Sequence, residues 1–291
     1  MVDQYAALYD EIFVARQLQK YTHHDRNFWQ VKLRSIAQMT GPLVGQRLLD
    51  LGCGVGTCAI EYGLRGNQTV GVDYTLGAAR AGQEISQSKG LTQTTFCVGN
   101  VAQLPFESGT FDGVLASDIF EHLVPEVLDA TIGECARILK PGGTLYVMTW
   151  PTRYRYIFNS RVFLACVLPG FWLPPQWLKA YIRCIDRTIV QWYHVLRHGM
   201  THDAYRLASI HPNPLTVEAL RALFVKRGFA SIRISLQDLY GQEGRLRAQI
   251  VRRLFRSCDY AQSGLYAVCT TPTDGRRPAS APSPDTVRTY A

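Results

Sequence analysis

The stretch from residue 46 to residue 66 constrains the fold most, because a buried strand there runs into a glycine-rich turn and then into a helix. Leu48–Leu51 is apolar apart from Asp50, as expected of a strand in a parallel sheet that is covered on both faces. Glycines follow at alternate positions, namely Gly52, Gly54 and Gly56. Glycine lets the backbone lie close against a ligand, and the next helix points its N-terminus at the same place. A ligand site is therefore expected where this strand ends.

Strands and helices alternate from residue 48 to residue 149. Strands are expected at 48–51, 69–73, 95–98, 111–116 and 144–149, and helices at 57–65, 76–89 and 125–139. A helix capped by Thr216 and ended by Gly228, and strands at 229–236 and 264–270, complete the pattern. Alternation of this kind predicts right-handed βαβ units in an open parallel sheet, with ligands beyond the carboxyl ends of the strands.

The residues around the glycine-rich turn exclude two common phosphate-binding motifs. A dinucleotide fingerprint requires a glycine where this chain has Thr57, and the chain contains no Gly-Lys-Ser/Thr sequence of a P-loop. Asp73 ends the next strand, 17 residues after Gly56, where a carboxylate can bind the hydroxyl groups of a ribose. The pattern therefore favours a ribose-containing ligand held by this carboxylate.

Four sequence blocks in order carry a resemblance to a known family. They are LLDLGCGVGT, GVDY, GNVAQLPFESGTFDGVLASDIFEHL and LKPGGTLYVMTW. With these blocks, residues 48–150 resemble the core of a class I S-adenosylmethionine-dependent methyltransferase of the small-molecule, ubiquinone-biosynthesis-like type. The resemblance implies an α/β fold with a Rossmann-like, seven-stranded, mostly parallel sheet whose last strand is antiparallel. It also implies S-adenosyl-L-methionine as the cofactor.

The same resemblance assigns the turn to the methionine part of the cofactor. It implies contacts from Asp50 and from the backbone of Gly52, Cys53 and Gly54. Gly56 is expected to allow close packing of the following helix.

For the rest of the cofactor, the resemblance implies contacts from the ends of the next strands. Asp73 is expected to bind both ribose hydroxyls, and Tyr74 to lie along the adenine. Asn100 stands where the family usually has aspartate, and its amide oxygen can still accept a hydrogen bond from the adenine amino group. Val101 is expected to donate its backbone N–H to the adenine ring, and Ser117 to border the sulfonium.

A catalytic residue is not identified by the sequence. The resemblance implies that His122 stands on the wall between cofactor and acceptor, where a capping or orienting role fits it as well as catalysis. His194 is a second candidate, among several histidines near the core or the lid. No metal site is expected.

The chain is expected to divide into five parts. These are an N-terminal helical cap (1–45), the cofactor-binding core (46–150), a lid insertion (151–214), the completion of the sheet (215–270) with a second insertion (237–263), and a disordered tail (271–291).

The lid insertion is far longer than a typical connection between a strand and a helix. It is rich in aromatic residues, including Trp172, Trp177 and Trp192, and its net charge is +6. Such a lid suits a flat or greasy acceptor that carries a negative group. Two alternatives stay open: the aromatic residues form the lid's own small core, or the lid docks on anionic lipid, together with the arginine-flanked helix expected near 245–256.

Charge is distributed unevenly along the chain, at −4 for residues 1–150 and +12 for residues 151–291. A basic half raises the alternative of a nucleic-acid methyltransferase. Against this, the strand that ends in Ala116-Ser117-Asp118 lacks the Asn/Asp-Pro-Pro-aromatic signature, and the chain has no Pro-Cys pair. Because the cofactor motifs are nearly intact, a protein that only retains the fold and binds without catalysis is disfavoured.

Cysteine usage and hydropathy indicate a compartment. The eight cysteines include no CxxC pair, no apolar run reaches eighteen residues, and no apolar leader follows Met1. We therefore expect a cytoplasmic enzyme, peripheral at the inner face of a membrane if the lid docks on lipid. Its expected partner is a small-molecule acceptor and not a nucleic acid, and the sequence leaves its oligomeric state undetermined.

Overall fold

A single mixed sheet organises the chain in the computed structural model, which describes residues 26–149, 165–166, 168–199, 215–237 and 264–275. The strand order is β3-β2-β1-β4-β5-β7-β6. The strands are β1 (Arg47–Leu51), β2 (Gln68–Asp73), β3 (Thr94–Val98), β4 (Phe111–Ser117), β5 (Leu139–Thr149), β6 (Ser231–Gln237) and β7 (Gly264–Thr270).

The first five strands are parallel, whereas β7 runs antiparallel to both β5 and β6. The Rossmann-like α/β sheet expected from the sequence is thereby confirmed. The strand order reverses between β1 and β4, and open sheets of this kind bind ligands outside the carboxyl ends of the strands at such a reversal.

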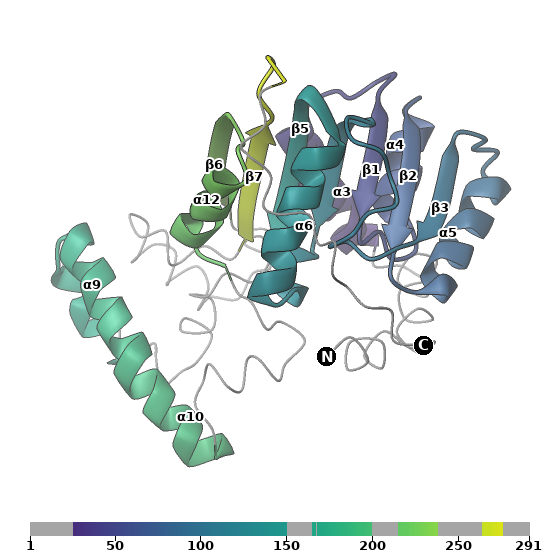
Figure 1. Cartoon of the computed structure of the whole chain (residues 1–291). Helices are drawn as coiled ribbons and strands as arrows, with labels where there is room; N and C mark the ends of the chain where they lie inside the picture. The colour runs from purple at the N-terminus through teal and green to yellow at the C-terminus, as the bar shows by residue number, and fades with distance from the viewer. Residues whose placement is uncertain (1–25, 150–164, 167, 200–214, 238–263, 276–291) are drawn as a thin grey trace, which may run out of the picture.

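Helices cover both faces of the sheet (Figure 1). They are α3 (Arg26–Thr40), α4 (Thr57–Leu64), α5 (Leu76–Ser88), α6 (Pro125–Ile138) and α12 (Val217–Lys226). Neighbouring residues of a strand point to opposite faces, so that Leu48 joins a core with α3 and α4, while Leu49 joins a core with α6 and α12. The expected cap of α12 is present, since Thr216 Oγ1 accepts a hydrogen bond from Ala219 N.

The fifth strand begins earlier than the sequence predicts. Pro141-Gly142-Gly143 was expected to turn the chain into a strand at 144, but β5 starts at Leu139 and its register on β4 shifts between Phe111 and Gly113. The irregularity is held by the ion pair between Lys140 and Asp112. A glycine at a positive φ angle, Gly142, lets the backbone bend without leaving the sheet.

The chain stays packed on the sheet after β7. Thr271, the first residue of the predicted disordered tail, is instead buried. Its N–H donates to Gly143 O at 3.0 Å, and its hydroxyl donates to Lys140 O at 2.7 Å. These bonds tie residues after β7 to the irregular start of β5.

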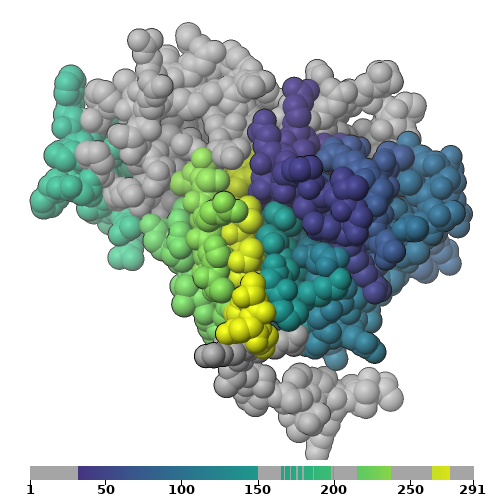
Figure 2. All heavy atoms as spheres, turned by 90° about the horizontal axis from the view of Figure 1, so that it is seen from above, coloured from purple at the N-terminus to yellow at the C-terminus, as the bar shows by residue number. Residues whose placement is uncertain are grey.

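Part of the predicted lid forms a helical arm, defined here as residues 168–199. It contains η2 (Leu168–Trp172), α9 (Pro175–Ile185), the π-helical η3 (Asp186–Val190) and α10 (Gln191–His198). The arm lies on the side of the sheet to which the arrowheads of β1, β2 and β3 point (Figure 1). Viewed from above, it forms an outer edge of the molecule, beyond α12 (Figure 2).

Several predictions fall outside the described residues, including most of the N-terminal cap, the flanks of the lid (151–164 and 200–214), the second insertion after Gln237 and the tail from 276. The five-part division of the chain stays a prediction. Among the described residues, no helix combines the length and the hydropathy that crossing a bilayer requires.

Candidate functional site

The carboxyl ends of β1, β2 and β4 bring together most of the residues that the sequence singles out. The glycine loop (Gly52–Gly56) follows β1, Asp73 ends β2, and Ser117 ends β4. Asp73 is joined to the loop directly, since its Oδ2 accepts a hydrogen bond from Gly54 N at 2.8 Å. Residues far apart in the sequence therefore line one end of the sheet.

The three glycines of the loop do not all serve the same purpose. A Cβ on Gly52 would overlap the side chain of Ile119, which follows β4, and a Cβ on Gly56 would overlap the ring of Phe96 on β3. Both positions therefore need glycine for close packing. Gly54 also has a positive φ angle, but a Cβ there would meet no atom of the described residues within 4 Å. Among these residues, nothing fills the space beside the middle of the loop, which leaves room there for a ligand.

Cys53 contributes its backbone to the loop. Its N–H donates to Val72 O at 3.0 Å, which fixes the loop against the end of β2. Burial raises the pKa of the Cys53 thiol well above its ordinary value. The thiol therefore stays neutral at physiological pH and is a poor nucleophile.

The Asp73 carboxylate is held in place before any ligand binds. Its Oδ1 accepts hydrogen bonds from Thr75 N at 3.0 Å and from Thr75 Oγ1 at 3.1 Å, while Oδ2 accepts from Gly54 N. A carboxylate has about four acceptor positions, and three are used by these bonds, so at least one remains for a ligand hydroxyl. The carboxylate is oriented by the backbone on both sides.

Asp50 is an acidic group kept in the interior. Its side chain is 4% exposed, and its Oδ2 accepts a hydrogen bond from Ala59 N at 2.9 Å, in the first turn of α4. Burial raises the pKa of Asp50 from 3.8 to about 6, against the opposing effects of the Ala59 N–H and of Lys32. A carboxylate held at such a cost to stability is typical of a functional site.

Lys32 and Asp118 form an ion pair that the sequence did not reveal. Lys32 Nζ on α3 lies 2.7 Å from Asp118 Oδ2, just after β4, and the two side chains are 11% and 29% exposed. Burial alone would lower the pKa of Lys32, but Asp118 and Asp50 raise it above the ordinary value, so the ammonium stays charged. No spacing rule links a helix before the sheet to the end of β4, so only the fold shows the pair.

The end of β4 also holds an unsatisfied polar group. Ser117 Oγ is buried and has no hydrogen-bond partner in the part of the chain that the structure describes. Asp118 follows in a left-handed conformation, with a φ angle of 55°, and its N–H donates to Met148 O at 2.8 Å. A buried hydroxyl without a partner is costly, and a bound ligand beside the loop can satisfy it.

The residues assigned to adenine lie around β2 and the turn after β3. Tyr74 is exposed, so its ring is accessible from solvent. Asn100 is exposed as well, and its Oδ1 accepts a hydrogen bond from Ala102 N at 2.9 Å, which fixes the turn after β3. Val101 packs partly against the core. These side chains are positioned locally, by the turns that carry them.

The two candidate histidines lie in different places. His122 ends the short helix η1 (Phe120–His122) just after β4, whereas His194 lies on α10 in the helical arm. Beside His122, Glu121 is buried and its Oε2 accepts a hydrogen bond from Thr149 Oγ1 at 2.7 Å. Glu121 is a second acid that the sequence did not single out, and its burial between the ends of β4 and β5 is visible only in the fold.

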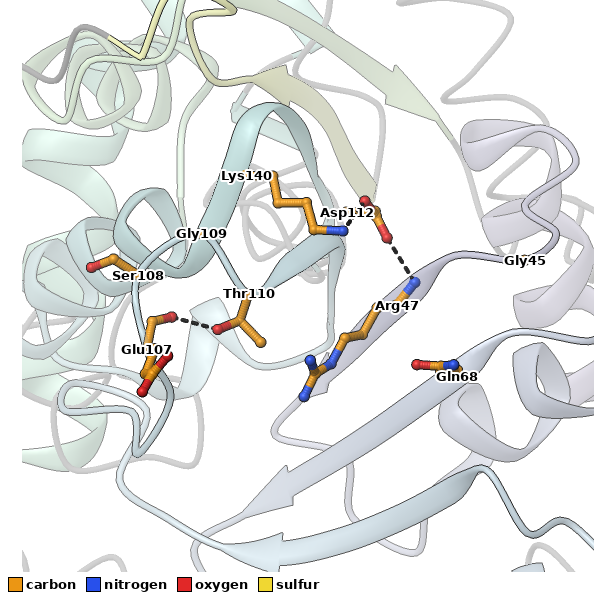
Figure 3. Close-up of a pocket in the computed structure, with 9 residues that line it drawn as sticks. All are labelled: Gly45, Arg47, Gln68, Glu107, Ser108, Gly109, Thr110, Asp112 and Lys140. Atoms are coloured by element: carbon orange, nitrogen blue, oxygen red, sulfur yellow. Dashed lines mark hydrogen bonds and ion pairs between the residues drawn. The ribbon is translucent and has the colours of Figure 1, made fainter.

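A separate hollow of about 520 Å³ lies at the other end of the strands, where they begin (Figure 3). It is lined by residues that precede or begin strands, including Arg47, Gln68 and Thr110, and by the ion pair of Asp112 with Lys140. Asp112 also accepts a hydrogen bond from Arg47 N at 2.9 Å, so this carboxylate is structural. The hollow lies at the amino ends of the parallel strands and is not the site described above.

Comparison with known proteins agrees with this geometry. A family model described as a methyltransferase domain matches residues 49–147. Ubiquinone biosynthesis O-methyltransferase of Xanthomonas campestris pv. campestris is 31% identical over 195 residues, which cover 64% of this chain and 79% of the relative. Norajmaline N-methyltransferase of Rauvolfia serpentina is 33% identical over 113 residues, which cover 37% of each chain.

A solved structure shares the fold. It is Haemonchus contortus phosphoethanolamine N-methyltransferase 2 in complex with S-adenosyl-L-methionine, with a TM-score of 0.53 and 16% identity over 84% of this chain and 53% of that chain.

Proposed function

The chain belongs to the class I S-adenosylmethionine-dependent methyltransferases, and on that premise we propose that it methylates a small acceptor that is lipophilic, anionic or both. The cofactor is S-adenosyl-L-methionine, which supplies an electrophilic methyl group on a sulfonium. The proposal rests on the contact between the glycine loop and the Asp73 carboxylate. The N–H of Gly54 in this loop donates a hydrogen bond to Asp73 and so orients the carboxylate.

The charged groups at the ends of β1 and β4 suit the amino-acid part of the cofactor. Lys32 carries a positive charge there, is paired with Asp118, and has its pKa raised by Asp50 as well as by Asp118. A zwitterion with an ammonium and a carboxylate finds a partner of opposite charge for each group in this set. The buried Ser117 hydroxyl adds a hydrogen-bonding group beside them.

The nucleoside part is assigned to the end of β2 and the turn after β3. Asp73 would accept hydrogen bonds from the ribose hydroxyls, and the exposed ring of Tyr74 would cover the adenine. Asn100 and the backbone N–H of Val101 would contact the edge of the base. The exposure of Tyr74 fits a residue that a ligand covers.

Methyl transfer by in-line displacement requires the protein to align the acceptor with the methyl group and to exclude water. An oxygen acceptor also needs a base, whereas some carbon and nitrogen acceptors do not. Glu121 and His122 are neighbours in η1, just after β4, and they are the candidate groups to receive a proton that leaves the acceptor. His194 on α10 is the less favoured candidate, since it lies in the helical arm and not at the strand ends.

The nature of the acceptor is inferred from the lid and from the relatives. Two of the relatives are named as a ubiquinone biosynthesis O-methyltransferase and a norajmaline N-methyltransferase, and both names point to small-molecule acceptors. The predicted lid of this chain is aromatic and basic, which suits a greasy body with a negative group. A second candidate acceptor is a membrane lipid at an anionic surface, which the exposed tryptophans of the arm favour. With either acceptor, we propose that the enzyme works in the cytoplasm.

Transfer of a labelled methyl group tests the proposal. The protein is incubated with radiolabelled cofactor and with three acceptor pools: a solvent extract of lipophilic metabolites, purified phospholipids, and polynucleotides. We expect label in the lipophilic metabolites, and we expect much less of it with the Asp73→Ala variant at the same cofactor concentration. Label in phospholipid would support the second candidate, while label confined to polynucleotide would contradict the small-molecule assignment.

A further inference from the structure

The helical arm has two apolar faces, of which only one is covered. Leu178, Ile182, Ile185 and Val190 are almost completely buried. The other face carries large side chains in solvent: Trp177 is 63% exposed, Trp192 69% and Leu196 80%. We call these three residues the tryptophan face. A folded chain rarely leaves two tryptophans and a leucine of one helix in water unless they meet a partner.

The tryptophan face is long and continuous. From α9 through η3 into α10 the backbone stays helical from Pro175 to His198. At a rise of about 1.5 Å per residue, Trp177 and Trp192 stand roughly 22 Å apart along this axis. The face is therefore a stripe on the surface of the molecule and not a pocket for a small ligand.

Positive charge accompanies the stripe. Arg183, Arg187 and Arg197 are exposed on the same helix. Residues 168–199 contain four lysines and arginines but a single acidic residue, Asp186. A helix with large aromatic side chains on one face and arginines at its margins is typical of segments that lie in the interface of an anionic bilayer.

The position of the arm gives this surface a use. It lies on the side of the sheet where the parallel strands end, which is the side of the glycine loop and Asp73 (Figure 1). It also forms an outer edge of the molecule, so a flat surface can approach it (Figure 2). A bilayer against the arm would lie on the side of the sheet that carries the glycine loop and Asp73.

From these observations we propose that the tryptophan face docks the protein on an anionic lipid bilayer. A second copy of the chain fits this face less well, because a two-fold contact would bring the same arginines of both copies together. An anionic bilayer matches both the arginines and the tryptophans of the arm, since its headgroups are negative and its interfacial region accepts tryptophan rings. The docking does not depend on which acceptor is methylated.

Sedimentation of the full chain with vesicles tests the proposal. We expect binding to phosphatidylcholine vesicles that contain about 30% phosphatidylglycerol, and little binding to phosphatidylcholine alone. Affinity should fall at least about tenfold between roughly 50 mM and 500 mM salt. Binding that is equal for both vesicles, or absent from both, would overturn the proposal.

Matched variants locate the surface. The double variant Trp177→Ser with Trp192→Ser should lose binding about tenfold or more, and Arg187→Glu with Arg197→Glu should lose it by a similar factor and flatten its salt dependence. The control variants Leu64→Ser on α4 and Val225→Ser on α12 remove apolar side chains that are also exposed, and they should bind as the unmodified protein does. Equal loss in the controls would contradict the assignment.

A measurement on the unmodified protein keeps the test independent of folding defects. Tryptophan fluorescence should be quenched by lipids brominated near the headgroup end of the acyl chains, and only in vesicles that contain phosphatidylglycerol. Absence of quenching would refute insertion of the tryptophan face. A dimer in light scattering that dissociates in the Trp177→Ser, Trp192→Ser variant would assign the face to a second copy and overturn the bilayer.

Discussion

Replacing Asp50 by asparagine should stabilise the protein at neutral pH while it weakens cofactor binding. Burial raises the pKa of Asp50 from 3.8 to about 6. Because the pKa of the folded state lies above that of the unfolded state, the carboxyl group favours folding below about pH 4, and this contribution is lost as the pH rises through about 6. A difference of roughly two pKa units corresponds to about 3 kcal/mol.

The asparagine side chain removes this titration and keeps an oxygen that can accept the hydrogen bond from Ala59 N. A neutral acceptor makes a weaker bond than a carboxylate, by about 1 kcal/mol. We therefore expect Asp50→Asn to be about 1–3 kcal/mol more stable than the unmodified protein at pH 7.5, and no more stable at pH 4. The same change should weaken binding of the cofactor, because a negative charge is lost from its site.

Urea unfolding between pH 4 and pH 7.5 measures the effect as the difference between variant and unmodified protein. Asp112→Asn is the control, because burial would raise the pKa of Asp112 but Lys140 and the Arg47 N–H lower it overall. Removal of the Asp112 carboxylate should therefore cost stability at neutral pH and cost less as the pH falls. A difference for Asp50→Asn that does not change with pH would refute the reasoning.

Three further predictions concern the ion pair, the packing of the sheet and the basic half. Lys32→Met should destabilise the protein by about 3 kcal/mol in urea unfolding. This value is at the low end for breaking a buried ion pair, because Asp118 is partly exposed. A loss below about 1 kcal/mol, which is typical of exposed pairs, would show that the pair is not buried in solution. Gly82 lies on α5, and Gly82→Ala should lower stability by about 1–3 kcal/mol even though alanine favours helix. The reason is that the new Cβ would stand 2.7 Å from Phe96 Cε1. A gain in thermal stability would contradict this packing. Fluorescence titration should find no tight binding of polynucleotides at physiological salt, and a submicromolar complex there would contradict the small-molecule assignment.

The sheet could be predicted from the sequence because each strand is a short apolar run that ends at glycine or a polar residue. The boundaries of β1, β2 and β4 follow from such runs almost to the residue. The start of β5 did not follow, because Pro141-Gly142-Gly143 has the composition of a turn. The bonds that join Lys140, Asp112 and Thr271 keep that segment in the sheet.

The candidate site was predictable only where its residues are local in sequence. Gly54 and Asp73 stand next to strand ends, so their meeting follows from a parallel sheet, and the bond between them confirms that they meet. Lys32 comes from a helix before the sheet, and Glu121 is buried by contacts between the ends of β4 and β5. Such residues depend on how distant segments pack, and no pattern along the chain encodes that packing.

The central claim is that the glycine loop and the carboxylate at the end of β2 hold S-adenosylmethionine. Calorimetric titration of the cofactor into the protein tests it most directly, with Asp73→Ala and Thr75→Val as the paired variants. Asp73→Ala should weaken binding by about 10- to 150-fold, as expected for the loss of hydrogen bonds to a charged group worth about 1.5–3 kcal/mol. Thr75→Val removes the hydroxyl that donates to Asp73 and caps α5, so it should reduce stability and leave the affinity within about threefold. Unchanged affinity in a folded Asp73→Ala variant, or an equal loss in both variants, would contradict the account.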